Sequence, residues 1–266
     1  MNPYRCTFQM GMEKALEYRV NFVLSLLSAV FPIVIQTFLW NDLYGKSDAA
    51  AMTGYSYSQI MVYTLLASMV SHLVYTGFEY QVNEDIKNGG LNKYLVKPVN
   101  YRSYQFFSFL GEKAPQLLIL LAVAAALLIF SVAVLGLMLS FPRVLAFLVS
   151  LILGLVPNFF IFYCGALISF WLTDVNLVFG TVSVVLGVVS GGVFPMDSFG
   201  ERIAFAVNLL PFGYTTQFPV NIINGRFGLR ETGAGFLCQI FWICCFGMLA
   251  EILWKRGLKR FTAVGG

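Results

Sequence analysis

The chain has 266 residues, of which 58% are hydrophobic and only 11% are charged, and its mean hydropathy is +0.76. Soluble domains carry about 25% charged residues, so this composition excludes an ordinary soluble globular protein. The formal net charge of +4 is informative only through where the charges lie, and we expect no nucleic-acid partner. The sequence predicts an integral membrane protein in which residues 1–266 form a single transmembrane domain.

The N-terminal segment, residues 1–19, mixes charged and apolar residues and lacks the apolar core and cleavage site of a signal peptide. Its apolar residues recur at helical spacing: Tyr4, Phe8, Met12, Ala15 and Leu16. This pattern predicts an amphipathic helix that lies in the membrane interface beside the first span. A disordered tail is the alternative.

Several apolar runs have the length of about 20 residues that a helix needs to cross a bilayer core of about 30 Å. They are residues 20–40, 57–78, 115–139, 144–172, 177–194 and 233–254. Backbone polar groups in lipid must be hydrogen-bonded within their own segment, so we expect these runs to be helices. Pro157 in the long fourth run predicts a tilt or a kink. The predicted fold class is all-α, a polytopic membrane protein with six transmembrane helices.

The basic residues orient these spans. Most of the 17 lysines and arginines lie in the N-terminal segment, in the connection 79–114 and in the C-terminal tail. They are Arg5, Lys14, Arg19, Lys87, Lys93, Lys97, Arg102, Lys113, Lys255, Arg256, Lys259 and Arg260. By the positive-inside rule both termini and the connection 79–114 are cytoplasmic, as an even number of spans requires. The five cysteines then fall in spans or near the cytoplasmic face, and we expect free thiols.

The sequence lacks the motifs of several enzyme classes. It has no G-x-x-x-x-G-K-[ST] phosphate-binding loop, no HExxH and no GxSxG, and we expect no catalytic residue and no metal site. The single histidine, His72, lies inside the second predicted span, where an ionisable group is a functional candidate. A neutral imidazole bonded to a backbone carbonyl is the reading that we favour. Asp174 and Glu251 lie near span ends, where we expect them to be solvated.

The cytoplasmic connection contains a predicted short helix. Residues 83–105, NEDIKNGGLNKYLVKPVNYRSYQ, open with an acidic turn and break at Gly89-Gly90. Apolar residues then recur, and a Lys-Pro pair ends the helix; these residues are Leu91, Tyr94, Leu95, Lys97 and Pro98. We expect the apolar face to be exposed, which suits docking into a groove on a soluble partner. A helix held on lipid headgroups by its lysines is the open alternative.

The connection 195–232 is too polar for a further span and too apolar for an ordinary solvent loop. Pro195 is expected to stop the helix before it, and Pro211 to break the segment in two. Asp197 and Ser198 follow Pro195 directly, so we expect them to cap the first short helix.

Two segments resemble ABC-2 type permeases, most closely the branch of uncharacterised ABC-2 family transport permeases. The first is the pattern Ile86-x-x-Gly89-x-Leu91 followed by Leu95 and Lys97-Pro98. The second is residues 190–226, in which a glycine-rich span end, a Phe-Pro turn and a Leu-Pro-Phe sequence frame two short helices. Its match is carried by Gly191, Gly192, Phe194, Pro195, Pro211, Phe212, Tyr214 and Pro219. Gly200 departs from the pattern, because a proline is expected to open the short helix.

The resemblance implies roles for both segments. The cytoplasmic segment corresponds to the coupling helix that sits in a cleft of the ATP-binding subunit. Its expected coupling residues are Glu84, Ile86, Gly89, Leu91, Tyr94, Leu95, Lys97 and Pro98. The two external helices are expected to re-enter the outer leaflet and roof the translocation path, which requires that protein or a cavity cover their backbone. A surface helix lying on the membrane is the alternative.

A ladder of small residues in the fifth span, Ser183-x-x-x-Gly187-x-x-x-Gly191, allows helix backbones to approach closely. It predicts either packing within one subunit or, as the resemblance suggests, the interface between two permease subunits.

These observations predict the permease subunit of an ATP-driven exporter of a hydrophobic or amphiphilic substrate. The expected partners are two ATP-binding subunits, which hold ATP and Mg, and a second permease that is a different chain. We expect no cofactor bound by this chain and a location in the bacterial inner membrane. The alternatives are a scaffold subunit of a membrane complex and a membrane-embedded lipid-modifying enzyme.

Overall fold

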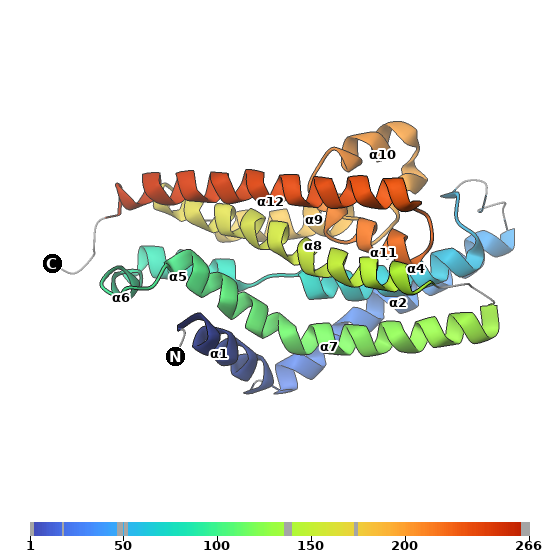
Figure 1. Ribbon diagram of the computed structural model, residues 1–266, viewed down its shortest axis with the longest axis horizontal. Helices are drawn as coiled ribbons and strands as arrows, with labels where there is room; N and C mark the ends of the chain where they lie inside the picture. The colour runs from blue at the N-terminus through green and yellow to red at the C-terminus, as the bar shows by residue number, and fades with distance from the viewer. Residues whose placement is uncertain are drawn as a thin grey trace.

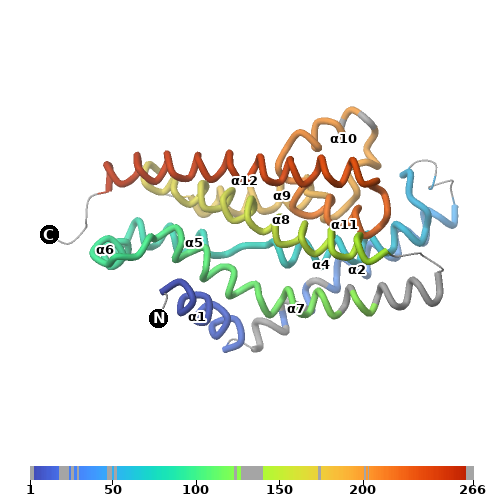
Figure 2. Tube along the Cα trace, viewed as in Figure 1, coloured from blue at the N-terminus to red at the C-terminus, as the bar shows by residue number. Residues whose placement is uncertain are grey.

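The computed structural model describes residues 3–17, 19–46, 50, 53–135, 140–172 and 175–261. Within these residues all regular secondary structure is helical. Figure 1 shows long helices that run side by side along one axis, and Figure 2 traces the chain through them. The predicted all-α class is confirmed.

The longer helices form the body of the protein. They are α1 (Pro3–Glu17), α2 (Arg19–Lys46), α4 (Tyr57–Val74), α5 (Phe78–Lys87), α7 (Tyr101–Leu135), α8 (Phe141–Leu167), α9 (Asn176–Val189) and α12 (Leu229–Leu258). Shorter elements connect them: α6 (Asn92–Leu95), α10 (Glu201–Asn208), α11 (Gln217–Ile223) and the 3-10 turns η1 (Ile168–Phe170), η2 (Met196–Phe199) and η3 (Phe212–Tyr214).

Length and composition make part of this body fit to cross a membrane. Among the described residues, three helical segments are long and apolar enough: Tyr57–Lys87, Phe141–Phe170 and Leu229–Leu258. The α9 helix is also apolar but has only 14 residues, fewer than the roughly 20 that span a bilayer core. The structure thus supports a polytopic helical membrane protein, while the count of six spans stays a prediction.

The second predicted span is not one continuous helix. It ends at Val74, and α5 begins only at Phe78, so residues 75–77 interrupt it. The interruption is stabilised from α8, where the Asn158 side-chain amide donates a hydrogen bond to the Val74 carbonyl. Hydropathy alone does not reveal this break, because the donor lies 84 positions away in the sequence.

The third predicted span begins earlier than expected. The α7 helix starts at Tyr101 instead of 115, so Pro115 lies inside it, and residues 136–139 lie outside the described part of the chain. The additional N-terminal part of α7 packs against α1, which lies along this half of the helix. A Cβ at Gly11 or Gly111 would overlap backbone oxygens of the other helix. The predicted N-terminal helix therefore packs on the third span, and not only beside the first.

The fifth predicted span ends before its predicted end. The α9 helix stops at Val189, and Gly191 then adopts φ +81°, a conformation outside the helical region. We expected Pro195 to stop this helix. It does not, because the chain has already turned at Gly191.

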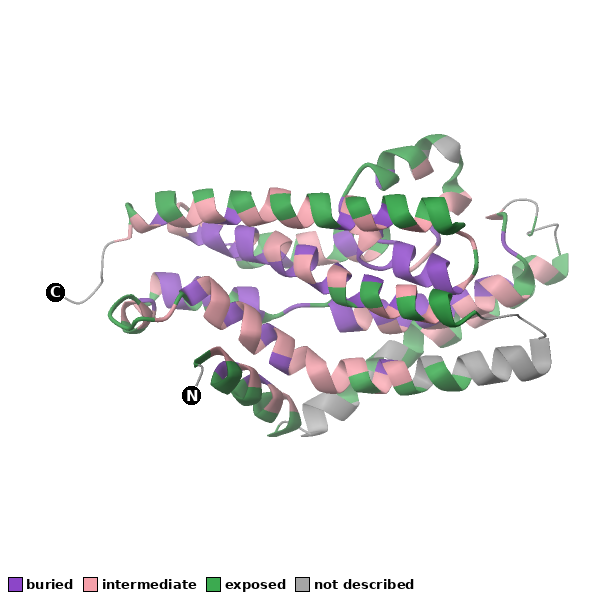
Figure 3. Ribbon diagram, viewed as in Figure 1, coloured by how far each residue is buried: buried purple, intermediate pink, exposed green. Residues whose placement is uncertain are grey.

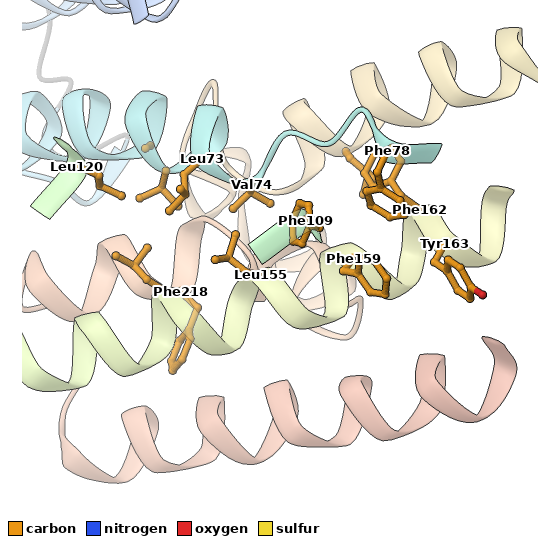
Figure 4. Packing of buried hydrophobic residues seen from close by; sticks show 14 of the residues in the cluster. Leu73, Val74, Phe78, Phe109, Leu120, Leu155, Phe159, Phe162, Tyr163 and Phe218 are labelled. Carbon is orange, nitrogen blue, oxygen red and sulfur yellow. The ribbon is translucent and has the colours of Figure 1, made fainter. Parts of the chain in front are cut away.

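The α8 helix lies at the centre of the apolar core. Phe159 packs against Phe78 of α5 at a ring-centroid distance of 4.7 Å and against Phe109 of α7 at 5.6 Å. Figure 4 shows these three rings between the helices, with Leu155, Phe162 and Tyr163 along the same helix. In Figure 3, α8 carries many buried side chains, whereas α12 shows exposed positions along its length. The core thus links α5, α7 and α8.

The two connections identified from sequence lie toward opposite ends of the molecule. Figure 1 places α6 near both chain termini at one end, and the start of α12 at the other, with α10 and α11 toward it. This arrangement agrees with the predicted assignment of the connections 79–114 and 195–232 to opposite sides.

Candidate functional site

The turn between α5 and α6 is built around Asp85. Its backbone carbonyl accepts a hydrogen bond from the Leu91 amide at 2.8 Å. Its buried carboxylate accepts one from the Tyr101 hydroxyl at 2.8 Å and pairs with Lys93 at 3.5 Å. A Cβ at Gly90 would lie 2.5 Å from this carboxylate, so only glycine fits there without a shift. These contacts fix the turn to the first turn of α7.

The predicted coupling residues divide into an inner and an outer set. Ile86 and Leu91 are buried, and Tyr94 is half-buried against Tyr101 and Tyr104. The exposed apolar face is therefore smaller than we expected, because Leu91 is buried and does not contribute to it. The exposed tip consists of Lys93, Leu95, Val96, Lys97 and Pro98, with Glu84 exposed on α5. Val96, whose side chain is 82% exposed, was not among the predicted residues.

Gly89, between the two helices, adopts φ +72°, which an L-residue rarely adopts. The predicted break at Gly89-Gly90 is therefore confirmed. Gly89 provides the backbone conformation, and Gly90 provides the space for Asp85.

A small cavity with several polar residues in its lining lies beside the interruption between α4 and α5. It has a volume of about 70 Å³, and its polar lining residues come from α4, α8, α9 and the segment before α11. They are Ser71, Asn158, Ser183, Ser190, Thr215 and Thr216. Ser183 of the small-residue ladder therefore faces the inside of the chain, and Gly187 lines the same cavity.

The rest of the glycine-rich end of α9 packs on α4 and α11. A Cβ at Gly191 would lie 2.6 Å from the Tyr63 hydroxyl and 2.7 Å from the Gln217 side-chain oxygen. The Gly191 carbonyl accepts a hydrogen bond from that hydroxyl at 2.6 Å, and Gly192 faces Ser71. At Gly187, by contrast, no atom lies within 4 Å of an added Cβ. Packing within the subunit accounts for Gly191, and an interface role for Gly187 stays a prediction.

The external segment contains one buried and one exposed helix. All residues of α11 are buried, including Pro219, and its start is bonded through the Gln217 amide to the Ser190 carbonyl at 3.0 Å. The α10 helix is instead largely exposed, with Phe205 at 68%, and Leu209, which directly follows it, is 60% exposed. Gly200 begins α10 with φ +93°, which explains why proline, with its fixed negative φ, is absent there. Phe194, Phe212 and Tyr214 are half-buried, and Pro195 and Pro211 are buried.

A polar cluster ties this segment to the start of α4. The Tyr55 hydroxyl lies 3.2 Å from the Asp197 carboxylate and 3.1 Å from the Asn221 side-chain oxygen. The Arg226 guanidinium stacks 4.2 Å over the Tyr55 ring. Burial and the Asp197 charge raise the pKa of the Tyr55 hydroxyl above its usual value, so it remains a neutral donor. The prediction that Asp197 and Ser198 cap the first short helix is therefore wrong, because neither η2 nor α10 has a side-chain cap.

Comparison with known families decides the family of this chain. A family model described as an ABC-2 family transporter protein matches residues 30–265. The chain belongs to the ABC-2 transporter family. A search of curated proteins finds no match. Membership implies a non-enzymatic transmembrane subunit that associates with ATP-binding subunits.

In this ABC-2 protein, His72 has a charged neighbour, Lys113, that the sequence did not show. Lys113 of α7 interacts electrostatically with both His72 and Glu79 of α5. The Nε2 atom of His72 and one oxygen of the buried Glu79 have no hydrogen-bond partner in the described part of the chain. Glu251, which we expected to be solvated, also forms an ion pair with Arg102 at 2.9 Å. Asp174 lies outside the described residues.

Several residues that organise these sites were missed from sequence. Asp85 was not among the predicted site residues. It lies five residues before Gly90, and the position of its carboxylate explains why that residue is a glycine. Tyr55 and Asn221 lie 166 positions apart, so no local pattern joins them. Among the described residues no group of three His, Cys, Asp or Glu side chains is arranged to hold a metal.

Proposed function

We propose that this chain is the permease subunit of an ATP-driven ABC-2 exporter with six spans and both termini in the cytoplasm. It works with a second, different permease and with two ATP-binding subunits that hold ATP and Mg. The complex moves a hydrophobic or amphiphilic substrate out across the bacterial inner membrane. No cofactor is needed in this chain, because the energy comes from the partner ATPases.

The observation that carries this proposal is the α5–α6 turn, a rigid base with an exposed tip. The base is held by Asp85, Tyr101 and the buried Leu91, while Val96 and Leu95 project outward. Such a tip suits insertion into a groove of a soluble partner. Its end of the molecule also carries the basic C-terminal residues, which supports a cytoplasmic location.

Side-chain contacts connect this tip to the helices of the membrane part, so its movement can be transmitted to them. The hydrogen bond from Tyr101 to Asp85 links it to α7, and Phe78 on α5 stacks on Phe159 of α8. Because residues 75–77 interrupt the helix, α5 can shift relative to α4 without bending a continuous helix. Closure of the ATPase pair would therefore move α5, α7 and α8 together.

The opposite half supports a partnered, lipid-embedded subunit. The α9 helix exposes Val184 and Val185 next to Gly187, an apolar surface that fits a second permease. Two exposed apolar residues, Phe205 in α10 and Leu209 directly after it, suit contact with the outer leaflet, while α11 is covered by protein. The exposure of α10 and the burial of α11 support the re-entrant arrangement of the external segment.

A photo-cross-linking amino acid placed at Val96 in the chain, expressed in its native membrane, tests the proposal. Leu229 is the matched control, because it is equally apolar, is 92% exposed and starts α12 at the opposite end. We expect irradiation to join the Val96 position, but not the Leu229 position, to a protein with a phosphate-binding loop. Recovery of intact chain with no ATPase attached at Val96 would reject the coupling role.

A further inference from the structure

A lateral groove is lined by residues of α7, α8 and α12. Its volume is about 800 Å³. Its accessible apolar lining includes Phe160 of α8, Phe106 of α7 and Met248 of α12. Volumes of this size are typical of sites for small organic molecules. The groove lies on a different set of helices from the small-residue ladder of α9 and from the α6 tip.

Polar groups gather at one end of this groove. Arg102 donates to the Glu251 carboxylate at 2.9 Å, and Lys255 pairs with the same carboxylate at 3.1 Å. Beside them Tyr101 stacks on Trp254 at a ring-centroid distance of 5.4 Å. These contacts join α7 to α12 and close the groove at the end where both chain termini lie.

The charges at this end do not cancel. Two cations share one carboxylate, so one positive charge remains, and Arg256 adds another on the next residue of α12. The Arg102 side chain is 34% exposed and therefore accessible to a ligand beside it. An apolar trough with a cationic end matches an amphiphile that has a hydrocarbon chain and an anionic head.

We propose that this groove binds a membrane phospholipid with an anionic headgroup. One acyl chain lies over Phe160 and Met248, and the phosphate lies at Arg102 and Lys255. Basic pockets between transmembrane helices on the cytoplasmic side recognise such headgroups. The site requires that α7, α8 and α12 are in the membrane, but not that α6 binds an ATPase, so it can fail or hold independently of the proposed function.

Native mass spectrometry of the full chain in detergent tests the site, with phosphatidylglycerol and phosphatidylethanolamine added in turn. We expect wild type to bind phosphatidylglycerol more tightly, and Arg102→Gln to reduce that preference about fivefold, the effect of one basic residue near a lipid surface. Arg230→Gln is the matched control, because Arg230 is exposed at the opposite end of α12. Equal binding of the two lipids by wild type, or an unchanged preference in Arg102→Gln, would overturn the proposal.

A second pair of variants tests the location. A Cβ at Gly247 would meet only the Phe160 ring, at 3.8 Å, so Gly247→Leu fills the groove without a backbone clash. Gly233→Leu is its control on the same helix, because no atom lies within 4 Å of a Cβ there. We expect Gly247→Leu to lose at least tenfold in phosphatidylglycerol affinity and Gly233→Leu to lose none. Equal affinities would place the lipid elsewhere.

Wild-type protein provides a measurement that needs no variant. Cys244 lines the groove and is exposed, and Cys6 on α1 is an exposed free thiol outside it. We expect phosphatidylglycerol to slow alkylation of Cys244 severalfold relative to Cys6, measured by peptide mass spectrometry. Equal protection of the two thiols would contradict binding in this groove.

Discussion

The Tyr101 hydroxyl donates a hydrogen bond of 2.8 Å to the Asp85 carboxylate, and both side chains are buried. Gln105 donates to the same hydroxyl at 2.9 Å, so the oxygen of Tyr101 is held from two sides. This pair joins the turn that carries the exposed tip to the first turn of α7. The tip cannot tilt freely, because its base belongs to the packed part of the protein.

Replacing Tyr101 by Phe tests that joint. The change leaves the buried Asp85 carboxylate without this donor, and a hydrogen bond to a charged group contributes about 1.5–3 kcal/mol. We expect lower thermal stability in detergent and weaker coupling of substrate to ATP turnover in the assembled complex. Tyr80→Phe is the control, because Tyr80 is exposed and keeps its ring contact with Phe179. A Tyr101→Phe variant as stable and as coupled as wild type would contradict the joint.

Replacing Gly111 by Ala tests the docking of α1 on α7. The new methyl group would overlap the Phe8 carbonyl oxygen, and overpacking typically costs about 1–3 kcal/mol. We expect the N-terminal helix to become more susceptible to limited proteolysis, with a lower unfolding temperature. Gly45→Ala in α2 is the control, because no atom lies within 4 Å of a Cβ there. If the two variants behave alike, close backbone packing does not hold α1 in place.

Local patterns in the sequence predicted the helical class, the break at Gly89 and the short helices before and after Pro211. Each depends on neighbouring residues: apolar runs, a glycine pair or a proline. The interruption after Val74 was not predictable in this way, because its stabilising donor, Asn158, is on another helix. Hydropathy measures whether a segment tolerates lipid, but not whether its helix continues.

The same distinction applies to the candidate sites. The exposed lysine-proline end of the tip followed from local sequence, whereas Leu91, which we placed on the exposed face, is buried in the core. Asp197 looked like a helix cap from its position after Pro195. In the structure it bonds to Tyr55, which is 142 positions away, so a tertiary partner competed successfully with the local one.

Replacing Asp197 by Asn tests how the external segment is held to α4. The carboxylate accepts hydrogen bonds from Tyr55 at 3.2 Å and from the Asn221 amide at 3.4 Å. The amide N–H of an asparagine at this position would face the Tyr55 hydroxyl and the Asn221 amide, which are themselves donors. We therefore expect the local opening free energy to fall by about 1–2 kcal/mol. Hydrogen exchange of residues 196–223 should accelerate. Asp42→Asn, at the exposed pair with Lys46, should leave exchange in that segment unchanged.

Gly191 and Gly187 belong to one sequence ladder, yet the structure gives them different surroundings. Gly191 combines φ +81° with a Cβ position 2.6 Å from the Tyr63 hydroxyl, whereas a Cβ at Gly187 meets nothing within 4 Å. We expect Gly191→Ala to destabilise the isolated chain by about 1–3 kcal/mol, through backbone strain and overlap. Gly187→Ala should leave the isolated chain as stable as wild type or slightly more stable.

The assembled complex then separates the two interpretations of the ladder. If α9 packs against a second permease, Gly187→Leu should weaken the permease pair while the isolated chain remains folded, because close helix approach needs a small residue there. Gly45→Leu in α2 is the control, since Gly45 also has no atom within 4 Å of a Cβ. The measurement is the recovery of the second permease in affinity purification, compared with the thermal stability of the chain alone. Undiminished recovery with Gly187→Leu would place the interface on another face, and α9 would then contact lipid.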